Sequence, residues 1–253
     1  MPTTKRMDFE GPHGKLSAKL DAPDGTPRAY GVFAHCFTCS KDVLAATRIA
    51  QGLAAQGIAM LRFDFAGLGN SGGAFADTNF SSNVADLLAA ADFLRTRFAA
   101  PQLLVGHSMG GAAVLAAAAR IPEARAVVTI AAPSEPTYVL DCLLADHLDT
   151  IAAQGEARVP LAGREFDIRQ HFVDDALQHL LADQIAGLER ALLVMHAPDD
   201  GTVPFAHAER IFAQARQPKA FVALDGVDHL VTGREDAAWV AGVSAAWSGR
   251  YLA

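Results

Sequence analysis

Short apolar runs alternate with longer stretches of helical periodicity along most of the chain. The apolar runs are nearly continuous in hydrophobic residues, as the buried strands of a parallel sheet require. They are Ala29–Ala34, Ile58–Phe65, Leu103–Val105, Val127–Ala131, Leu192–Met195 and Ala220–Leu224. Helical periodicity lies between them, near 41–55, 82–98, 109–120, 205–215 and 235–247. Repeated strand–helix units predict a doubly wound, mostly parallel α/β sheet with helices on both faces, and Phe9 with Leu16–Leu20 predicts an antiparallel hairpin at its edge.

One segment, 137–190, interrupts this alternation. Val139–Ile151 and Phe172–Ile185 have helical patterns, and Ala157–Ile168 predicts a small hairpin. We interpret 137–190 as a lid inserted into a core made of 1–136 and 191–253. It would cover the carboxyl ends of the strands, where open α/β sheets bind ligands. The alternative is an extra structural layer without substrate contact.

The pentapeptide Gly106-His107-Ser108-Met109-Gly110 is the strongest functional signal, because it follows a predicted strand and opens a predicted helix. A G-x-S-x-G nucleophile elbow needs this context. The sharp turn lifts the serine hydroxyl above the sheet edge, and its flanking glycines avoid backbone clashes. Ser108 is therefore the candidate nucleophile, and the N–H of Met109, at a helix N-terminus, is a candidate oxyanion donor. The alternative is a tight turn with a helix-capping serine.

A serine nucleophile needs a histidine base held by a carboxylate, in the chain order Ser, acid, His in this fold. His229 is preferred among the chain's nine histidines because it lies just past the last predicted strand, where a loop can reach the elbow. The acid should follow the strand Leu192–Met195. Asp199 and Asp200 are adjacent there, and spacing alone does not choose between them.

Composition narrows the class of protein. The chain has 253 residues, of which 51% are hydrophobic, and this suits one domain with a sizeable core. The net charge of −7 and the lack of a basic patch argue against nucleic-acid binding. No apolar stretch approaches a membrane span, and no signal peptide is visible, so we expect a cytoplasmic protein with no membrane partner. Three cysteines, an odd and low number, suit a reducing compartment rather than a disulfide framework.

These motifs together resemble α/β hydrolases close to serine aminopeptidases, esterases and dienelactone hydrolases. The resemblance rests on the elbow, the turn ending in Val203-Pro204, the loop around His229, and the turn from Phe63 to Gly72. It implies the α/β-hydrolase fold. In that family the acid stands three residues before a Val-Pro pair, which implies Asp200. The expected catalytic residues are then Ser108, Asp200 and His229.

The oxyanion loop departs from the commonest pattern of these relatives, which is His-Gly-x after the third strand. This chain has His35-Cys36-Phe37 there. By position, the N–H of Phe37 is the second oxyanion donor, and Cys36 takes the place of the glycine. We expect Cys36 to be a tolerated small side chain. The alternative is that it lies close to Ser108, so that oxidation or alkylation blocks the oxyanion hole.

The run from Phe33 to Asp42 further resembles the hydrolase half of bifunctional hydrolase–OsmC fusion proteins. This implies an OsmC-like, thiol peroxidase-like domain as a candidate partner, in a fusion or in trans. The sequence predicts no particular oligomeric state. In the lid, five apolar side chains could line an acyl pocket or simply pack on the sheet: Leu140, Leu143, Leu144, Phe172 and Leu177. Of these, Leu140, Leu144 and Phe172 are the candidate substrate-binding residues.

Two further patterns match cofactor or metal motifs only superficially. Gly67 to Gly72 matches G-x-G-x-x-G, but no helix starts directly at those glycines, as a dinucleotide site requires. Cys36 and Cys39 form C-x-x-C, the spacing of a redox or metal pair. Cys142 is the only third thiol, so a zinc site is poorly supported. We expect Cys39 to be a buried small side chain, and redox chemistry is the alternative. We therefore expect no cofactor and no metal.

The leading hypothesis is a serine hydrolase that cleaves a carboxylic ester or thioester of a small acyl substrate through an acyl-enzyme. A serine aminopeptidase-like amidase or an acyltransferase could use the same residues. A non-catalytic partner module for an OsmC-like domain is the alternative from another class, because a fold does not guarantee a function.

Overall fold

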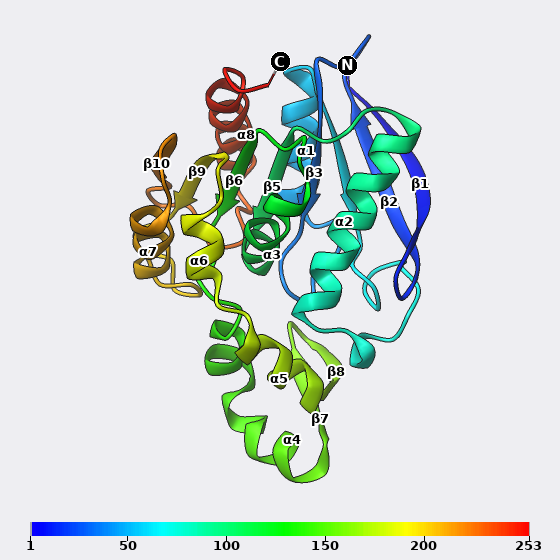
Figure 1. Ribbon diagram of the computed structural model, residues 1–253, viewed down its shortest axis with the longest axis vertical. Coiled ribbons are helices and arrows are strands. Elements are labelled where there is room, and N and C mark those ends of the chain that lie inside the picture. The colour runs from blue at the N-terminus through cyan, green and yellow to red at the C-terminus, as the bar shows by residue number, and fades with distance from the viewer. Residues whose placement is uncertain (1, 253) are drawn as a thin grey trace.

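An eight-stranded sheet forms the centre of the structure, a computed structural model that describes residues 2–252 (Figure 1). The strand order is β1-β2-β4-β3-β5-β6-β9-β10. β2 pairs antiparallel with β1 and β4, and all later neighbours are parallel. The strands are β1 (Thr3–Gly11), β2 (Gly14–Ala22), β3 (Ala29–Ala34), β4 (Ile58–Phe63), β5 (Leu103–His107), β6 (Ala126–Ile130), β9 (Ala191–His196) and β10 (Lys219–Ala223).

Helices cover both faces of this sheet, as the alternation predicted. One face carries α1 (Leu44–Ala55) and α8 (Arg234–Ser248), and the other carries α2 (Phe80–Arg97), α3 (Met109–Ala117) and α7 (Ala206–Gln214). Successive residues of one strand enter opposite layers: Leu103 packs under α1 and α8, and Leu104 packs under α2 and α3. This explains the nearly continuous hydrophobic runs. The predicted fold class is confirmed.

Two of the element boundaries that differ from the predicted ones have clear local reasons. β4 ends at Phe63 rather than Phe65 because the chain turns at Asp64, whose carboxylate is held by Lys41. Helix α2 begins at Phe80 rather than 82 because Asn79 and Ser82 form a capping box. The Asn79 side chain accepts from the Ser82 N–H at 2.8 Å, and the Ser82 hydroxyl accepts from the Asn79 N–H at 2.9 Å.

The segment 137–190 projects from one end of the sheet (Figure 1). It contains a π-helical turn (Leu140–Leu144), a 3₁₀ turn (Ala145–His147), α4 (Leu148–Gln154), the hairpin of β7 (Glu156–Leu161) and β8 (Arg164–Arg169), α5 (Gln170–Gln178) and α6 (Leu181–Ala186). The stretch expected to be one helix from 172 to 185 is two helices, because His179 and Leu180 are extended. α5 packs on α2, and α6 packs on α3 and α7, so the returning half of the segment is docked on the core.

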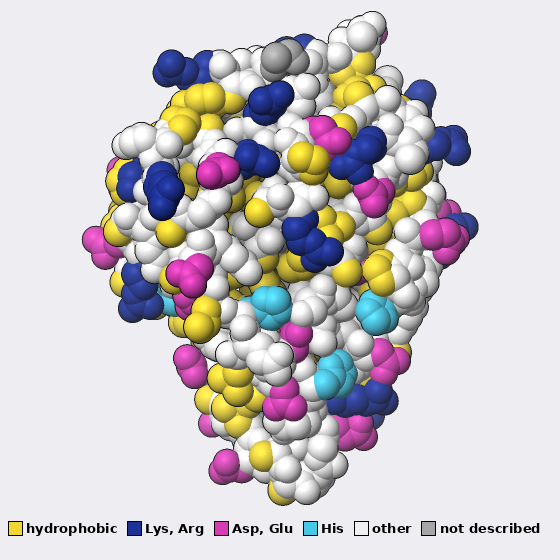
Figure 2. Space-filling model, in the orientation of Figure 1, with side chains coloured by type: hydrophobic (Ala, Val, Ile, Leu, Met, Phe, Trp, Pro, Cys, Tyr) yellow, Lys and Arg dark blue, Asp and Glu magenta, His cyan; other side chains and the backbone are white. Residues whose placement is uncertain are grey.

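Within residues 2–252, every helix is too short or too polar to cross a membrane. Figure 2 shows basic and acidic side chains interspersed over the face in view, without a continuous basic patch. The expected cytoplasmic location stays a prediction.

The loop after β4 depends on a buried acid in α2. The carboxylate of Asp86 is fully buried and accepts a hydrogen bond from the Ala66 N–H at 2.9 Å. Burial is the main cause that raises the pKa of Asp86 to about 6, although the Ala66 hydrogen bond and nearby His13 oppose the shift. The folded protein therefore binds this proton more tightly than the unfolded chain does.

We predict that this proton makes folding stability fall as the pH rises from about 4 to about 6. The raised pKa contributes stability below the ordinary value of 3.8, and this contribution is lost as pH rises through the folded pKa. The loss is at most about 3 kcal/mol. Asp86→Asn keeps an acceptor for Ala66 and should remove this part of the pH dependence, measured by urea unfolding from pH 4 to 7. The prediction would be contradicted if the free energy of unfolding changed with pH in the same way in both proteins.

Candidate active site

The nucleophile elbow lies where β5 meets α3, at the carboxyl edge of the sheet. Ser108 separates the two elements and has φ +54° and ψ −126°, a conformation that residues other than glycine rarely adopt. Such strain persists where the surrounding structure imposes it. A Cβ at Gly110 would lie 2.3 Å from the Ala34 carbonyl oxygen at the end of β3. Only glycine allows this approach, which packs the elbow against β3.

Three side chains that were predicted from the sequence form one hydrogen-bonded chain. Ser108 Oγ lies 3.1 Å from His229 Nε2, and His229 Nδ1 lies 2.8 Å from Asp200 Oδ2. They come from the β5–α3 turn, the loop after β10 and the turn after β9. When Nδ1–H donates to the carboxylate, Nε2 is free to accept the serine proton. The arrangement can therefore activate Ser108 as a nucleophile.

The Asp200 carboxylate is buried and hydrogen-bonded on both oxygens. Oδ1 accepts from the N–H groups of Thr202 and Val203 at 2.8 and 2.9 Å, and Oδ2 faces His229. Burial alone would raise the pKa of Asp200, but the hydrogen bonds from His229 and the backbone outweigh it and hold the pKa below its usual value. Asp199 is exposed. Of the two adjacent acids, Asp200 is the one that orients the imidazole.

Two further histidines hold the backbone that carries His229 and Asp200. The sequence did not predict this role for them. His107 Nε2 lies 2.7 Å from the His229 carbonyl oxygen, and His196 Nε2 lies 2.8 Å from the Val203 carbonyl oxygen. Burial lowers the pKa of both rings, to about 4 for His107, so each is neutral at pH 7 and donates through Nε2–H. Their positions in the sequence could have indicated this role, because His107 directly precedes Ser108 and His196 ends the strand before Asp200.

The backbone beside Ser108 offers two hydrogen-bond donors. Phe37 and Met109 line the same cavity as Ser108. Met109 begins α3, and the first N–H groups of a helix have no intrahelical acceptor. In the described part of the chain, the Phe37 N–H has no protein acceptor either. The ring of His35 holds the loop, because its Nδ1 lies 2.8 Å from the Cys36 carbonyl oxygen. Two free N–H groups beside a nucleophile can bind an oxyanion.

A buried ion pair anchors the far end of the same loop. Lys41 donates to Asp64 through both Nζ and its backbone N–H, each at 2.6 Å. The glycine-rich turn 67–72 wraps around this carboxylate. The Asn70 N–H donates to it at 2.9 Å, and a Cβ at Gly69 would lie 2.2 Å from its Oδ2. The Asp64 carboxylate therefore accounts for Gly69, whereas Gly67 is required because a Cβ there would lie 2.4 Å from the Phe75 backbone nitrogen.

The cavity beside Ser108 is small, about 50 Å³. Leu140 and Leu144, which were predicted to bind substrate, do not line it, and both are buried in the hydrophobic core. Hydrophobicity alone selected these two leucines, whereas the π-helical turn directs them into the core and their neighbours toward Ser108. Phe172 is also buried, and its ring packs on Phe37 at 5.6 Å. The lining residues are Phe37, Ser108, Met109, Pro133, Tyr138, Val139, Cys142, Leu143, Thr202 and Val203.

The cysteines differ from expectation. Cys36 and Cys39 form a disulfide with a Cα–Cα distance of 5.3 Å, and Cys142 is free and exposed. The expectations of reduced cysteines, and of Cys36 and Cys39 as merely small side chains, are therefore wrong. A three-residue separation brings the two thiols together because the chain makes a tight turn there, with the Cys39 N–H donating to the Cys36 carbonyl at 3.2 Å. Within residues 2–252, no group of His, Cys, Asp and Glu is arranged to hold a metal ion.

Comparison with known families gives this geometry its context. Residues 25–154 match the serine aminopeptidase family S33. The chain belongs to this family of α/β hydrolases. The assignment to the hydrolases made from the sequence is thereby confirmed, whereas the closer likeness to hydrolase–OsmC fusions stays a prediction.

Solved structures and curated proteins of related sequence agree with the family. The crystal structure of an esterase domain from a Rhodothermus marinus protein is 45% identical, with a TM-score of 0.82, and the match covers 99% of this chain and 100% of that one. The rat mitochondrial palmitoyl-protein thioesterase ABHD10 is 27% identical over 173 residues. That match covers 66% of this chain and 57% of the rat protein. The structure of Est1E from Butyrivibrio proteoclasticus with ferulic acid bound shares the fold, with a TM-score of 0.83 and 21% sequence identity. The match covers 97% of this chain and 99% of that one.

We predict that His107→Phe lowers kcat about tenfold with little change in KM. The ring volume is kept, but the hydrogen bond that fixes the His229 carbonyl is lost, at a cost of about 1.4 kcal/mol or tenfold in rate. His107→Gln, which keeps a side-chain N–H donor, should recover part of the loss. Steady-state kinetics on an activated ester measure both effects. An unchanged kcat in His107→Phe would show that the bond does not position the base.

Proposed function

We propose that the protein is a serine hydrolase that cleaves carboxylic esters or thioesters of small acyl groups. The observation that carries the proposal is the hydrogen-bonded chain from Ser108 through His229 to Asp200, beside a cavity with two free N–H groups. A scaffold has no physical need for a strained serine held against a buried imidazole–carboxylate pair.

The chemistry follows from these positions. His229 Nε2 takes the proton of Ser108 Oγ as that oxygen attacks the acyl carbonyl, and the N–H groups of Phe37 and Met109 stabilise the oxyanion. His229 then donates the proton to the leaving alcohol or thiol, which leaves an acyl-Ser108. Water, deprotonated by His229, releases the acid. Asp200 stays ionised and stabilises the imidazolium in both steps.

The relatives support ester chemistry. A 45% identical structure over 99% of the chain is named an esterase domain, and the rat relative is named a thioesterase. The Rhodothermus structure is one domain of its protein, which fits the further proposal that an OsmC-like domain is a partner. Esters and thioesters also have better leaving groups than amides, which demand more of the same residues.

The cavity volume favours short acyl groups. One water needs about 10–15 Å³ of such space, so a cavity of about 50 Å³ takes only a few atoms. A palmitoyl chain, which the rat relative's name specifies for that protein, is far longer than this cavity. The lining residues Val139 and Leu143 stand at its lid side, and we propose them, rather than Leu140 and Leu144, as the acyl contacts. Phe172 acts indirectly, through the Phe37 ring.

We expect a fluorophosphonate probe to label wild type on Ser108, as read by peptide mass spectrometry. Ser108→Ala should lose labelling and lower kcat by about 10⁴ to 10⁶-fold, because the three residues act as a unit. Asp200→Asn should cost about 10⁴-fold through the wrong imidazole tautomer. The matched surface variant Asp199→Asn should stay within about twofold. Absent labelling in folded wild type would favour a non-catalytic binding module.

The acyl preference should be short and should depend on the cavity wall. With p-nitrophenyl esters and matched acyl thioesters, we expect kcat/KM to rise by up to about fourfold per methylene, or about 0.8 kcal/mol, and then to fall once the cavity is full. Val139→Ala should shift the optimum by about one to two methylenes. Leu140→Ala, in the adjacent core, should lower stability without moving the optimum. A shift in Leu140→Ala and none in Val139→Ala would reassign the pocket.

A further inference from the structure

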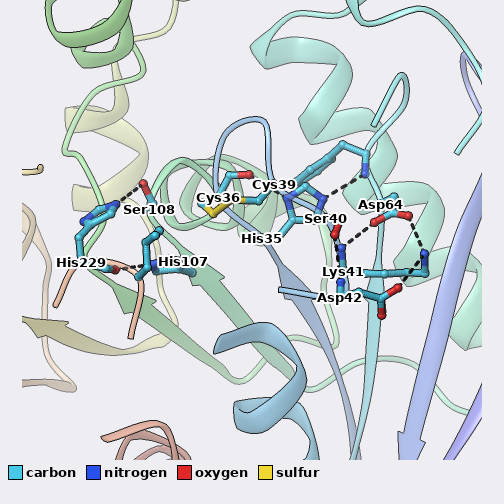
Figure 3. The surroundings of a disulfide bond; sticks show 12 residues. His35, Cys36, Cys39, Ser40, Lys41, Asp42, Asp64, His107, Ser108 and His229 are labelled. Atoms are coloured by element: carbon cyan, nitrogen blue, oxygen red, sulfur yellow. Dashed lines mark hydrogen bonds and ion pairs between the residues drawn. A yellow bond between two sulfur atoms is a disulfide. The ribbon is translucent and has the colours of Figure 1, made fainter. Parts of the chain in front are cut away.

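The Cys36–Cys39 disulfide lies between two functional groups of residues. Figure 3 shows it with Ser108, His107 and His229 on one side and the Lys41–Asp64 pair on the other. The four-residue turn that it closes contains Phe37, which lines the Ser108 cavity and whose N–H has no protein acceptor within residues 2–252. Any change in this turn therefore acts directly on an oxyanion donor.

The two cysteines differ in access to solvent. Cys36 is 5% exposed, whereas Cys39 is partly exposed. Exchange with an external thiol requires that its thiolate reach one sulfur in line with the S–S bond. Cys39 Sγ is therefore the sulfur that can be attacked, and Cys36 Sγ is the one that leaves.

A separate pocket leads to this disulfide. It has a volume of about 350 Å³, and both cysteines line it together with Val43, Leu44, His107 and Leu230. Leu44 is 52% exposed and Leu230 is 50% exposed, so the pocket has an apolar rim at the surface. It shares no lining residue with the cavity that contains Ser108. A molecule in this pocket would contact the disulfide without entering the acyl site.

We propose that Cys36–Cys39 is a thiol-exchange site that takes a small dithiol from this pocket, and that its reduction lowers the hydrolase activity. The second half of the proposal rests on the proposed function. Leu230 follows His229 directly, so the pocket also borders the loop that carries the base.

The dithiol supplies both electrons of the exchange, so the reaction needs no other reductant. A thiolate of the dithiol attacks Cys39 Sγ, the S–S bond breaks, and Cys36 leaves as a thiolate that takes a proton. The second thiolate of the dithiol then attacks its own sulfur in the mixed disulfide and releases Cys39 as a thiolate, which also takes a proton. The dithiol is oxidised by two electrons to a cyclic disulfide, and the protein gains two thiols.

Thr38 explains why reduction should move the oxyanion donor. It lies within the turn at φ +58° and is 8% exposed. A β-branched residue rarely adopts this left-handed conformation unless its surroundings impose it. The disulfide links the residues around Phe37 and Thr38, so breaking it allows Thr38 to return to negative φ. That rotation turns the Phe37–Thr38 peptide and moves Phe37 away from the cavity.

The surroundings limit the change to this turn. The ring of His35 still holds the Cys36 carbonyl at 2.8 Å, and Lys41 still holds Asp64. The strand before the turn and the ion pair after it do not depend on the disulfide. We therefore expect a local loss of one oxyanion donor, and the loss of one such donor costs about 10² to 10³ in kcat.

The test compares oxidised and dithiothreitol-reduced protein, with the state of each cysteine read by alkylation and peptide mass. Reduction of wild type should lower kcat at least tenfold. The double variant Cys36→Ser/Cys39→Ser should have the kcat of reduced wild type, and dithiothreitol should not change it. Thr38→Gly, which adopts positive φ without strain, should keep its kcat after reduction. Leu44→Glu, which places a carboxylate at the pocket rim, should slow reduction several-fold and leave the kcat of the oxidised protein unchanged.

Two outcomes would overturn the proposal. One is a disulfide that stays oxidised in folded protein under dithiothreitol, and the other is a reduced protein as active as the oxidised one. The failure of the proposed function has a different signature, because oxidised protein would then neither hydrolyse esters nor label at Ser108. Alkylation masses would still report the exchange reaction in that case.

Discussion

The close approach of three backbone segments at the elbow is the constraint on which the site depends. Ser108 sits at positive φ, its N–H donates to the Ile130 carbonyl of β6 at 2.8 Å, and Gly110 packs against the end of β3. The sheet register aligns these ends, with Ala34 opposite Gly106 and His107 opposite Ile130. Ser108 and the loop that contains Phe37 are thus placed by strand pairing, and the side chains only complete the arrangement.

Buried charged side chains anchor the loop that runs from Phe37 to Lys41. Arg62 donates to Asp21 at 2.6 Å and to the Lys41 carbonyl at 2.6 Å, and Lys41 pairs with Asp64. Buried ion pairs contribute little net stability because desolvation offsets their attraction. Breaking one partner, however, leaves an uncompensated charge in the interior. This network therefore fixes the position of residues 41–42 and 62–64 rather than making the fold more stable.

The sequence predicted the features that depend on local pattern. Near-continuous apolar runs located the parallel strands, and the G-x-S-x-G context located Ser108, because both are set by residues adjacent in the chain. The Asp200–His229 contact came from family resemblance and chain order. The roles of His107 and His196 were not predicted, because each acts through a backbone carbonyl, that of His229 or Val203, whose approach only the folded structure shows. Leu140 and Leu144 were assigned to the pocket because hydrophobicity does not distinguish a residue that faces substrate from one that faces the core. The disulfide was not predicted because the odd, low number of cysteines was given more weight than the C-x-x-C spacing of Cys36 and Cys39.

The aromatic rings over the oxyanion loop join the lid to the reacting centre. The Phe37 ring packs on Phe172 of α5 at 5.6 Å and on Phe75 at 5.7 Å, and Phe75 in turn meets Phe166 of β8 at 4.6 Å. Phe37, whose backbone N–H is the proposed oxyanion donor, thus contacts the segment 137–190 through its side chain. Under the proposed function, a substrate that displaced this segment would also displace that donor, so discrimination between acyl groups would be expressed in kcat rather than in ground-state affinity. Selectivity and rate would then be coupled, because the same ring would govern both.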